Sequence, residues 1–220
     1  NVAWHLCAFG LNPLFISRVG EDAAGQGILR AMERWGMDTS GVQQDPSQPT
    51  GAVDVSLGDD GEPTYAIVHP VAYDAIDPAQ LPTLTTGSLL YHGSLALRDA
   101  ISRSALASLQ SDWAPLRFVD INLRAPWYQG ENIGPLLEGA RWLKLNQGEL
   151  EALTPGELGL EQRAGDLLTR LRLELLIVSQ AERGAMAFTA DGGRTRVAPQ
   201  RAVEVADSVG AGDAFSSVMI

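Results

Sequence analysis

The residues best suited to chemistry lie near the C-terminal end, in the string Asp-Ser-Val-Gly-Ala-Gly-Asp-Ala-Phe at residues 207–215. Its two glycines permit a tight turn, and the residues after them can begin a helix. The amide groups of such a turn point into one concavity, which favours an anionic oxygen. The residues concerned are Gly210, Ala211, Gly212 and Asp213. The last of them also brings a carboxylate to the same place.

A carboxylate beside an anion-binding turn is a poor arrangement for merely holding phosphate, because like charges repel. The arrangement suits phosphoryl transfer, in which Asp213 removes a proton from a hydroxyl nucleophile while the amides stabilise the transferred group. A bare Gly-x-Gly-Asp would more simply be a glycine turn capped by an aspartate. The full nine-residue string favours the catalytic interpretation.

Other polar residues follow predicted strands. Asn146 and Glu149 have the spacing of a helix capping box, which is a sufficient explanation when the two residues are considered alone. Arg124 comes just after a strand predicted at residues 118–121, where an open parallel sheet presents ligand sites. A surface charge and a contact with phosphate or substrate are equally consistent with that position.

The elements that must position these residues alternate between strand and helix. Asp22 is expected to cap a helix that Gly36 ends and whose Ile28, Met32 and Trp35 share one face. Strands are predicted at residues 14–17, 89–92, 118–121, 142–145 and 175–178. Helices are predicted at residues 2–9, 100–109, 149–153, 161–171 and 213–220. This order predicts right-handed crossovers and a mostly parallel sheet between helix layers.

One segment interrupts the alternation. Residues 52–57 and 64–68 alternate in polarity around a Gly/Asp/Pro-rich turn, which predicts an antiparallel hairpin. Such a hairpin could decorate a sheet edge or close over a ligand. A second hairpin is expected to turn at residues 191–193.

The composition of the 220 residues excludes several classes of protein. The net charge of −11 argues against a nucleic-acid footprint, and no apolar run approaches the roughly 18–20 residues of a membrane helix. Lys144, the single lysine, is followed by Leu-Asn, so a Walker phosphate loop is absent. Cys7 is alone and suits a reducing compartment, hence the expectation of a cytoplasmic protein. The histidines lack metal-ligand spacing and are expected to be ordinary structural residues; they are His5, His69 and His92.

Residues 207–215 resemble the C-terminal signature of the ribokinase-like carbohydrate kinases (the PfkB family), Asp-Thr/Ser-x-Gly-Ala-Gly-Asp-x-Phe. Residues 1–3 and 11–25 are similar to the family's N-terminal signature. Asp-x-Asn-x-Arg at 120–124 resembles a stretch frequent in fructokinases and 2-keto-3-deoxygluconate kinases, and 146–149 matches the family's Asn-x-x-Glu motif. The resemblance covers essentially the whole chain. It implies a three-layer α/β/α sandwich with a mostly parallel central sheet and a small β lid.

The resemblance implies a catalytic role for the C-terminal motif. Asp213 would be the base that deprotonates the acceptor hydroxyl. Asn1 would hydrogen-bond sugar hydroxyls. The amides that would form the anion hole for the transferred phosphoryl group are those of Gly210, Ala211 and Gly212.

It also implies cofactors and a lid. Asn146 and Glu149 would organise Mg²⁺ and the ATP phosphates, with Glu149 acting on the ion through water, and Arg124 is a candidate substrate contact. Asp207 matches a position where many members bind a monovalent cation, which raises K⁺ as a further cofactor. The hairpin at 52–68 would belong to the lid over the sugar, which in many members also forms a homodimer interface.

The chain departs from the family pattern at two kinds of place. The family usually has Thr-x-Gly-x-x-Gly at the nucleotide site; here Ser179 keeps the hydroxyl and Gly184 the last glycine, but Ala181 replaces the first glycine. The family's first strand would precede Asn1, and residues after Ile220 usually complete the adenine pocket. We therefore expect both ends to be truncated.

These observations predict one α/β domain over residues 1–51 and 69–220, with the hairpin 52–68 as part of a lid. The predicted activity is transfer of the ATP γ-phosphoryl group to a hydroxyl of a small sugar, with fructose or a related ketose or keto-acid sugar favoured by residues 120–124. A ribose or nucleoside kinase of the same fold, and a non-catalytic sugar- or nucleotide-binding relative, are the alternatives. Neither a nucleic acid nor a membrane is expected as a partner.

Overall fold

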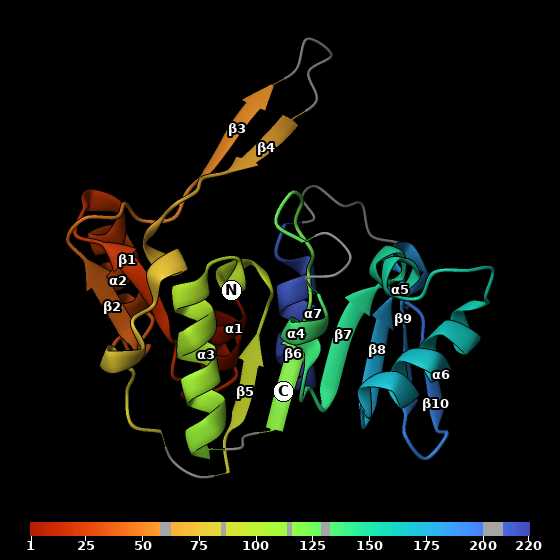
Figure 1. The fold of residues 1–220 in the computed structure, drawn as a ribbon. Helices are drawn as coiled ribbons and strands as arrows, with labels where there is room; N and C mark the ends of the chain where they lie inside the picture. The colour runs from red at the N-terminus through yellow and green to blue at the C-terminus, as the bar shows by residue number, and fades with distance from the viewer. Residues whose placement is uncertain (58–62, 85–86, 114–115, 129–132, 200–208) are drawn as a thin grey trace. The chain divides into compact units, whose positions relative to one another are not determined.

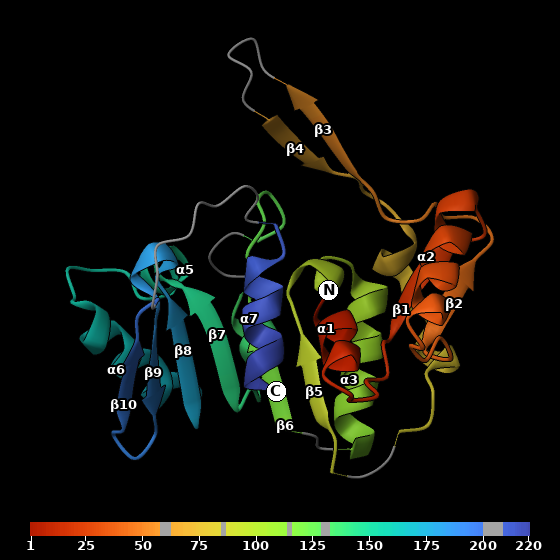
Figure 2. The same ribbon diagram turned by 180° about the vertical axis from the view of Figure 1, so that it is seen from behind.

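The computed structural model describes two compact units, which Figures 1 and 2 show from opposite sides. The described residues are 1–57, 63–84, 87–113, 116–128, 133–199 and 209–220. The first unit consists of residues 1–83, 99–111 and 210–220, and the second of residues 84–98 and 112–209.

The second unit is built on a six-stranded sheet with the order β10-β9-β8-β7-β6-β5. In chain order its strands are β5 (Leu89–His92), β6 (Leu116–Asp120), β7 (Trp142–Asn146), β8 (Leu175–Ser179), β9 (Ala185–Thr189) and β10 (Arg194–Val197). Strands β5 to β8 are parallel, whereas β9 and β10 pair antiparallel at one edge. The predicted mostly parallel sheet is confirmed, and the hairpin expected at residues 191–193 joins β9 to β10.

Helices cover this sheet and complete the core of the second unit. They are α4 (Gly134–Leu137), α5 (Gln147–Leu153) and α6 (Leu160–Leu171), with the 3-10 turns η3 (Leu95–Leu97) and η5 (Ala181–Arg183). Leu143 and Leu145 of β7, Leu176 of β8, Leu150 of α5 and Leu167 of α6 have no exposed surface. Burying one such side chain stabilises a fold by about 1.5–3 kcal/mol. This core explains why the strands read as continuous apolar runs.

The first unit contains more helix and only two-stranded sheets. Its helices are α1 (Val2–Ala8), α2 (Ala23–Arg34), α3 (Ala100–Trp113) and α7 (Ala211–Met219), with 3-10 turns η1 (Ala72–Ala75) and η2 (Pro78–Gln80). Strands β1 (Ser17–Gly20) and β2 (Val42–Asp45) are parallel, and β3 (Val53–Leu57) and β4 (Pro63–Ile67) form the antiparallel hairpin predicted from the sequence. In the described part of either unit, every helix is too short or too polar to cross a membrane.

The first predicted strand was misplaced. The structure begins β1 at Ser17, the last residue of the range 14–17, and pairs it with β2, which was not predicted. The sequence of β2, Val-Gln-Gln-Asp, carries no apolar alternation. Its Gln43 and Asp45 are nevertheless buried, because Gln43 bonds the backbone of Asp77 through both amide atoms and Asp45 pairs with Arg18 at 3.1 Å.

The predicted apolar face of α2 is only partly present. Met32 is 6% exposed, whereas Ile28 and Trp35 are 39% and 55% exposed, so of the three residues predicted to share one face only Met32 is buried. Trp35 lies just beyond the helix, where its ring packs edge-on against Trp4 at a centroid distance of 4.9 Å. The helix was nevertheless correctly predicted to end before Gly36, whose φ is +67°.

Asp22 caps α2 and joins it to the segment that enters the hairpin. Its Oδ1 accepts hydrogen bonds from Gly25 N and from Thr50 Oγ1, each at 2.7 Å. Its Oδ2 accepts a hydrogen bond from Thr50 N at 2.8 Å. These donors, Thr50 N foremost, lower the pKa of Asp22 from 3.8 to about 2, because they favour the ionised carboxylate.

We predict a specific pH dependence for the variant Asp22→Asn. Because the folded-state pKa is the lower one, the stabilisation from the Asp22 carboxylate is present above about pH 4 and is lost as the pH falls toward 2. The difference in unfolding free energy between wild type and variant should therefore shrink across this interval. Urea unfolding followed by circular dichroism at several pH values measures it, with Asp166→Asn on an exposed part of α6 as control. A difference that stays constant down to pH 2 would contradict the assignment.

Candidate active site

Helix α7 carries the described part of the predicted phosphoryl-transfer motif. Gly210 precedes it in the left-handed conformation, with φ +81° and ψ −5°, which glycine adopts without the strain that a β-carbon causes. Gly210 O accepts a hydrogen bond from Ala214 N at 2.9 Å, which closes the first turn. Ala211 and Gly212 follow at the exposed helix N-terminus. The partial positive charge of this terminus favours an anionic oxygen.

Asp213, in the same first turn, contacts the other predicted residue of this unit. Its Oδ2 accepts a hydrogen bond from Asn1 Nδ2 at 2.7 Å, and its side chain is half-buried. Asn1 occupies the N-cap position of α1 but makes no side-chain capping bond there. Helices α1 and α7 pack together, which keeps the two side chains in contact. The predicted base and the predicted sugar-binding residue are therefore neighbours.

In the second unit, Asn146 and Glu149 form the capping box that their spacing predicts. Asn146 Oδ1 accepts a hydrogen bond from Glu149 N at 2.9 Å, and Glu149 Oε2 accepts one from Asn146 N at 2.8 Å. The other oxygen, Glu149 Oε1, accepts a hydrogen bond from Leu123 N at 2.7 Å. Glu149 therefore also holds the loop that follows β6, a contact that the sequence did not predict.

A buried ion pair aligns the strands beneath this site. Lys144 of β7 lies beside Asp120 of β6, with 2.6 Å between Lys144 Nζ and Asp120 Oδ2. Tyr91 of β5 donates its hydroxyl hydrogen to the same oxygen at 3.0 Å. Asp120, the first residue of the family-like stretch 120–124, thus joins β6 to β5 and β7 inside the protein.

Arg124 lies in that loop and is exposed. Its carbonyl oxygen accepts a hydrogen bond from Trp127 N at 3.1 Å, which forms a turn. Asn122, two residues before Arg124, adopts a left-handed conformation, with φ +42°, which asparagine tolerates better than most residues. An exposed guanidinium at this edge of the sheet is accessible to an anionic ligand.

The predicted nucleotide loop follows β8. Ser179 is paired with Asn146 in the parallel register of β7 and β8 and donates its hydroxyl hydrogen to Leu145 O at 3.4 Å. Gly184 has φ +87°, and a β-carbon there would lie 2.0 Å from Val197 O, so both conformation and space require glycine. The loop is joined to the start of α5, because Arg183 and Gln180 donate hydrogen bonds to Gln147 Oε1.

The second unit therefore gathers four of the predicted residues at the carboxyl ends of β6, β7 and β8: Arg124, Asn146, Glu149 and Ser179, with Gly184 at the end of the adjoining loop. This is where open α/β sheets bind ligands. The other predicted residues, Asn1 and those around Asp213, belong to the first unit. Asp207 lies outside the described residues.

With this geometry established, comparison with known proteins identifies the chain. Residues 1–220 match the pfkB family carbohydrate kinase. The chain belongs to this family. The resemblance inferred from the motifs is thus confirmed. The predicted enzyme class, carbohydrate kinase, is confirmed with it.

Individual proteins similar to this chain are also sugar or riboside kinases. The chain is 32% identical to a fructokinase of Klebsiella pneumoniae, over 98% of this chain and 72% of that protein. The structure of an aminoimidazole riboside kinase from Salmonella enterica, complexed with aminoimidazole riboside and an ATP analogue, matches with a TM-score of 0.83 and 27% identity, over 99% of this chain and 72% of that chain.

A double mutant of a Vibrio cholerae O395 fructokinase, in its fructose-, ADP- and potassium-bound form, matches with a TM-score of 0.83 and 25% identity, over 98% of this chain and 71% of that chain. These structural matches confirm the predicted fold class. The pfkB-family chain spans between 58% and 72% of the length of the curated relatives it matches.

The backbone conformation of Ala181 gives a testable prediction about this departure from the family pattern. It adopts the left-handed conformation, with φ +51°, at the position where the family usually has glycine. This conformation costs a residue with a β-carbon roughly 1–2 kcal/mol, whereas glycine loses about 0.5–1 kcal/mol more backbone entropy on folding. Ala181→Gly should therefore raise the unfolding free energy by up to about 1 kcal/mol.

Urea denaturation measures this change. The matched control is Ala187→Gly in strand β9, which should lower the unfolding free energy by roughly 0.5–1 kcal/mol because the strand gains only flexibility. Equal destabilisation by both substitutions would contradict the left-handed assignment of Ala181.

Proposed function

We propose that the protein transfers the γ-phosphoryl group of ATP to a hydroxyl of fructose or of a related ketose or keto-acid sugar. The observation that carries the proposal is the contact between Asn1 and Asp213 at the N-terminus of α7, behind the left-handed Gly210. It places a side chain able to bind a hydroxyl next to a carboxylate able to accept that hydroxyl's proton. The 32% identity to a fructokinase supports the substrate class.

In the proposed mechanism, the oxygen of the acceptor hydroxyl attacks the γ-phosphorus while Asp213 accepts the proton of that hydroxyl. The bond between the γ-phosphorus and the bridging oxygen breaks, and ADP leaves. Asn1 orients the Asp213 carboxylate through its amide hydrogen. The amides of Gly210, Ala211 and Gly212, at the positive end of α7, stabilise the charge on the phosphoryl oxygens. One donor of this kind is commonly worth about 3–4 kcal/mol of barrier.

The residues around α5 fit a magnesium ion held through water. Both oxygens of Glu149 accept backbone hydrogen bonds, and their remaining lone pairs are available to water molecules in the ion's shell. Asn146 lies beside Glu149 and Ser179 beside Asn146, so we assign the ATP phosphates to these residues and to the loop ending at Gly184. Mg²⁺ would neutralise the charge of those phosphates.

The proposal includes three further points. A monovalent cation, K⁺, is assigned to Asp207, by analogy with the potassium-bound fructokinase. Arg124 contacts the substrate or a phosphate from its exposed loop. Since ATP is the phosphoryl donor and Cys7 is the lone cysteine, the activity is assigned to the cytoplasm.

The β3–β4 hairpin is the proposed lid. The paired residues Val55 and Tyr65 are each 59% exposed, and Val53, on the same face, is 52% exposed. An apolar face of this kind is suited to covering a sugar and excluding water, which limits wasteful ATP hydrolysis. The same face is the proposed homodimer interface.

A riboside is the second candidate substrate. The solved structure that contains aminoimidazole riboside matches this chain at 27% identity, close to the match with the fructose-bound enzyme. Asp120 does not favour either sugar, since Lys144 and Tyr91 occupy its Oδ2 inside the protein.

We predict that Asp213→Asn lowers kcat by about 10²–10⁴-fold, because the amide accepts no proton. ATP affinity should stay near that of the wild type, since the ATP phosphates are assigned elsewhere. A coupled assay of ADP release in the full-length protein measures kcat, and a fluorescent ATP analogue measures affinity. Asp166→Asn, an exposed change of the same chemistry on α6, is the control. Near-normal turnover in Asp213→Asn would refute the base assignment.

A substrate panel separates the sugars. We expect fructose to give a higher kcat/KM than ribose, aminoimidazole riboside or 2-keto-3-deoxygluconate in the same ADP-release assay. A preference for a riboside would transfer the assignment to the second candidate. Absence of sugar-dependent ADP release across the panel would favour a non-catalytic relative.

A further inference from the structure

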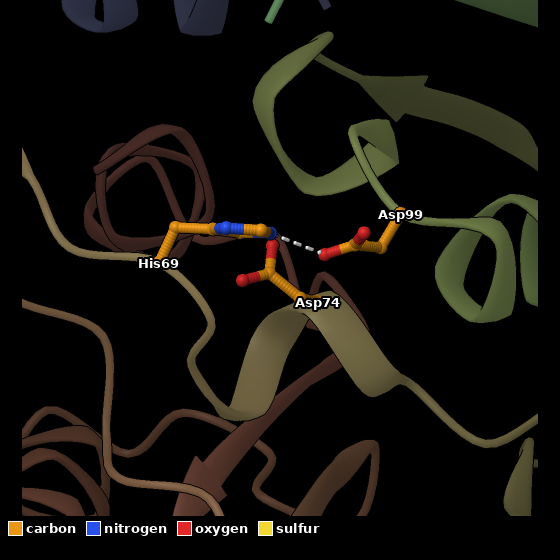
Figure 3. Close-up of side chains that lie close together, drawn as sticks. All are labelled: His69, Asp74 and Asp99. Atoms are coloured by element: carbon orange, nitrogen blue, oxygen red, sulfur yellow. Dashed lines mark hydrogen bonds and ion pairs between the residues drawn. The ribbon is translucent and has the colours of Figure 1, made fainter.

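Three side chains that the proposed phosphoryl transfer does not use converge in the first unit. Figure 3 shows His69, Asp74 and Asp99 directed toward one another. Their candidate ligand atoms, one imidazole nitrogen and two carboxylate oxygens, all lie within 4.8 Å of one another. His69 Nε2 and Asp99 Oδ2 are 2.7 Å apart. Each comes from a different segment: His69 follows β4, Asp74 lies in η1, and Asp99 immediately precedes α3.

Hydrogen bonds fix the segments that carry the two carboxylates. Asp74 Oδ2 accepts a hydrogen bond from Val71 N at 2.9 Å, which orients the carboxylate. Ser102 of α3, which is 2% exposed, donates its hydroxyl hydrogen to Tyr73 O at 2.8 Å and accepts a hydrogen bond from Ile76 N at 3.0 Å. This serine therefore joins α3 to η1 on both sides of Asp74. Side chains held on joined elements lose little freedom when they bind a ligand.

Burial and charge distinguish the cluster from ordinary surface carboxylates. Asp74 is 3% exposed, whereas the side chains of His69 and Asp99 are 31% and 40% exposed. A buried carboxylate is stabilised by a nearby positive charge, and the partly open rim gives a cation access to it. We propose that His69, Asp74 and Asp99 bind a divalent transition-metal ion of the Zn²⁺ type. Imidazole nitrogen and carboxylate oxygen are both ligands of such ions.

Small side-chain rotations adapt the cluster to a metal. Ligands about 2.0–2.2 Å from a tetrahedral ion stand roughly 3.3–3.6 Å from one another. The hydrogen-bonded pair of His69 and Asp99 must therefore separate by under about 1 Å, and the widest pair of ligand atoms must close by slightly more. Both half-exposed side chains have room to move, while Asp74 supplies the fixed ligand. Water completes the coordination.

A bound ion would join the segment that leaves β4 to the start of α3. It would therefore restrain the base of the β3–β4 hairpin. This site differs from the magnesium ion assigned to Glu149, which belongs to the second unit. The inference does not depend on the proposed kinase activity, since its evidence is the ligand geometry alone.

The test is a titration of the full-length protein, freed of metal by a chelator and kept without nucleotide. Zn²⁺ is titrated by calorimetry, and Co²⁺ by its visible absorption. We expect one Zn²⁺ ion per chain, and at least a 10-fold weaker affinity in His69→Gln and in Asp99→Asn. Even changes to the partners of metal ligands commonly cost 10- to 100-fold in affinity, and loss of a ligand should cost no less.

His5→Gln on α1 and Asp166→Asn on α6 are matched controls and should leave Zn²⁺ affinity unchanged. The ion should also raise the melting temperature of the wild type but not that of His69→Gln, and circular dichroism checks that both variants fold. Equal Zn²⁺ affinity in wild type and the two ligand variants, or failure of the wild type to bind Zn²⁺ at millimolar concentration, would overturn the proposal.

Discussion

A buried ion pair between neighbouring strands is the interaction on which the carboxyl edge of the sheet depends. The ATP phosphates are assigned to this edge. Lys144 and Asp120 are 6% and 5% exposed, so each charge relies on the other for compensation. Loss of one partner of such a pair commonly costs about 3–5 kcal/mol. The hydroxyl of Tyr91 extends the network to a third strand. Arg124 lies in the loop after β6, and Asn146 is the last residue of β7. The ion pair thereby joins β6 to β7 near the carboxyl ends of these strands, where the candidate ligand-binding residues lie.

Much of the fold could be predicted because its signals are local. The apolar run at residues 175–178, the turn-rich segment between residues 52 and 68 and the caps Asp22 and Gly36 each describe their own element. Strand β2 could not be predicted in this way, since its buried polar side chains are satisfied by residues far along the chain. The edge-on contact of Trp35 with Trp4 of α1 is likewise a tertiary contact, which the periodicity of α2 alone does not contain.

In the candidate site too, local features could be predicted from the sequence and long-range contacts could not. The capping box of Asn146 and Glu149 follows from a three-residue spacing, and the Gly210 turn from a nine-residue motif. The contact between Asn1 and Asp213 joins residues 212 positions apart, and the spacing of His69 from its two carboxylate neighbours shows no ligand pattern. Such long-range contacts come from tertiary packing. Sequence motifs identified Asn1 and Asp213 as site residues, although not their contact. No motif indicated the cluster of His69, Asp74 and Asp99.

The position of the single lysine has a practical meaning for chemical modification. The chain's other cationic side chains are arginines, and the ε-amino group of Lys144 is enclosed between strands and paired with a carboxylate. Acylating reagents, aldehydes and enzymes that acetylate or ubiquitinate lysine would find no accessible side-chain amine in the folded chain. Modification of this one nitrogen would therefore mark molecules in which the centre of the sheet has opened, which makes it an internal reporter of unfolding.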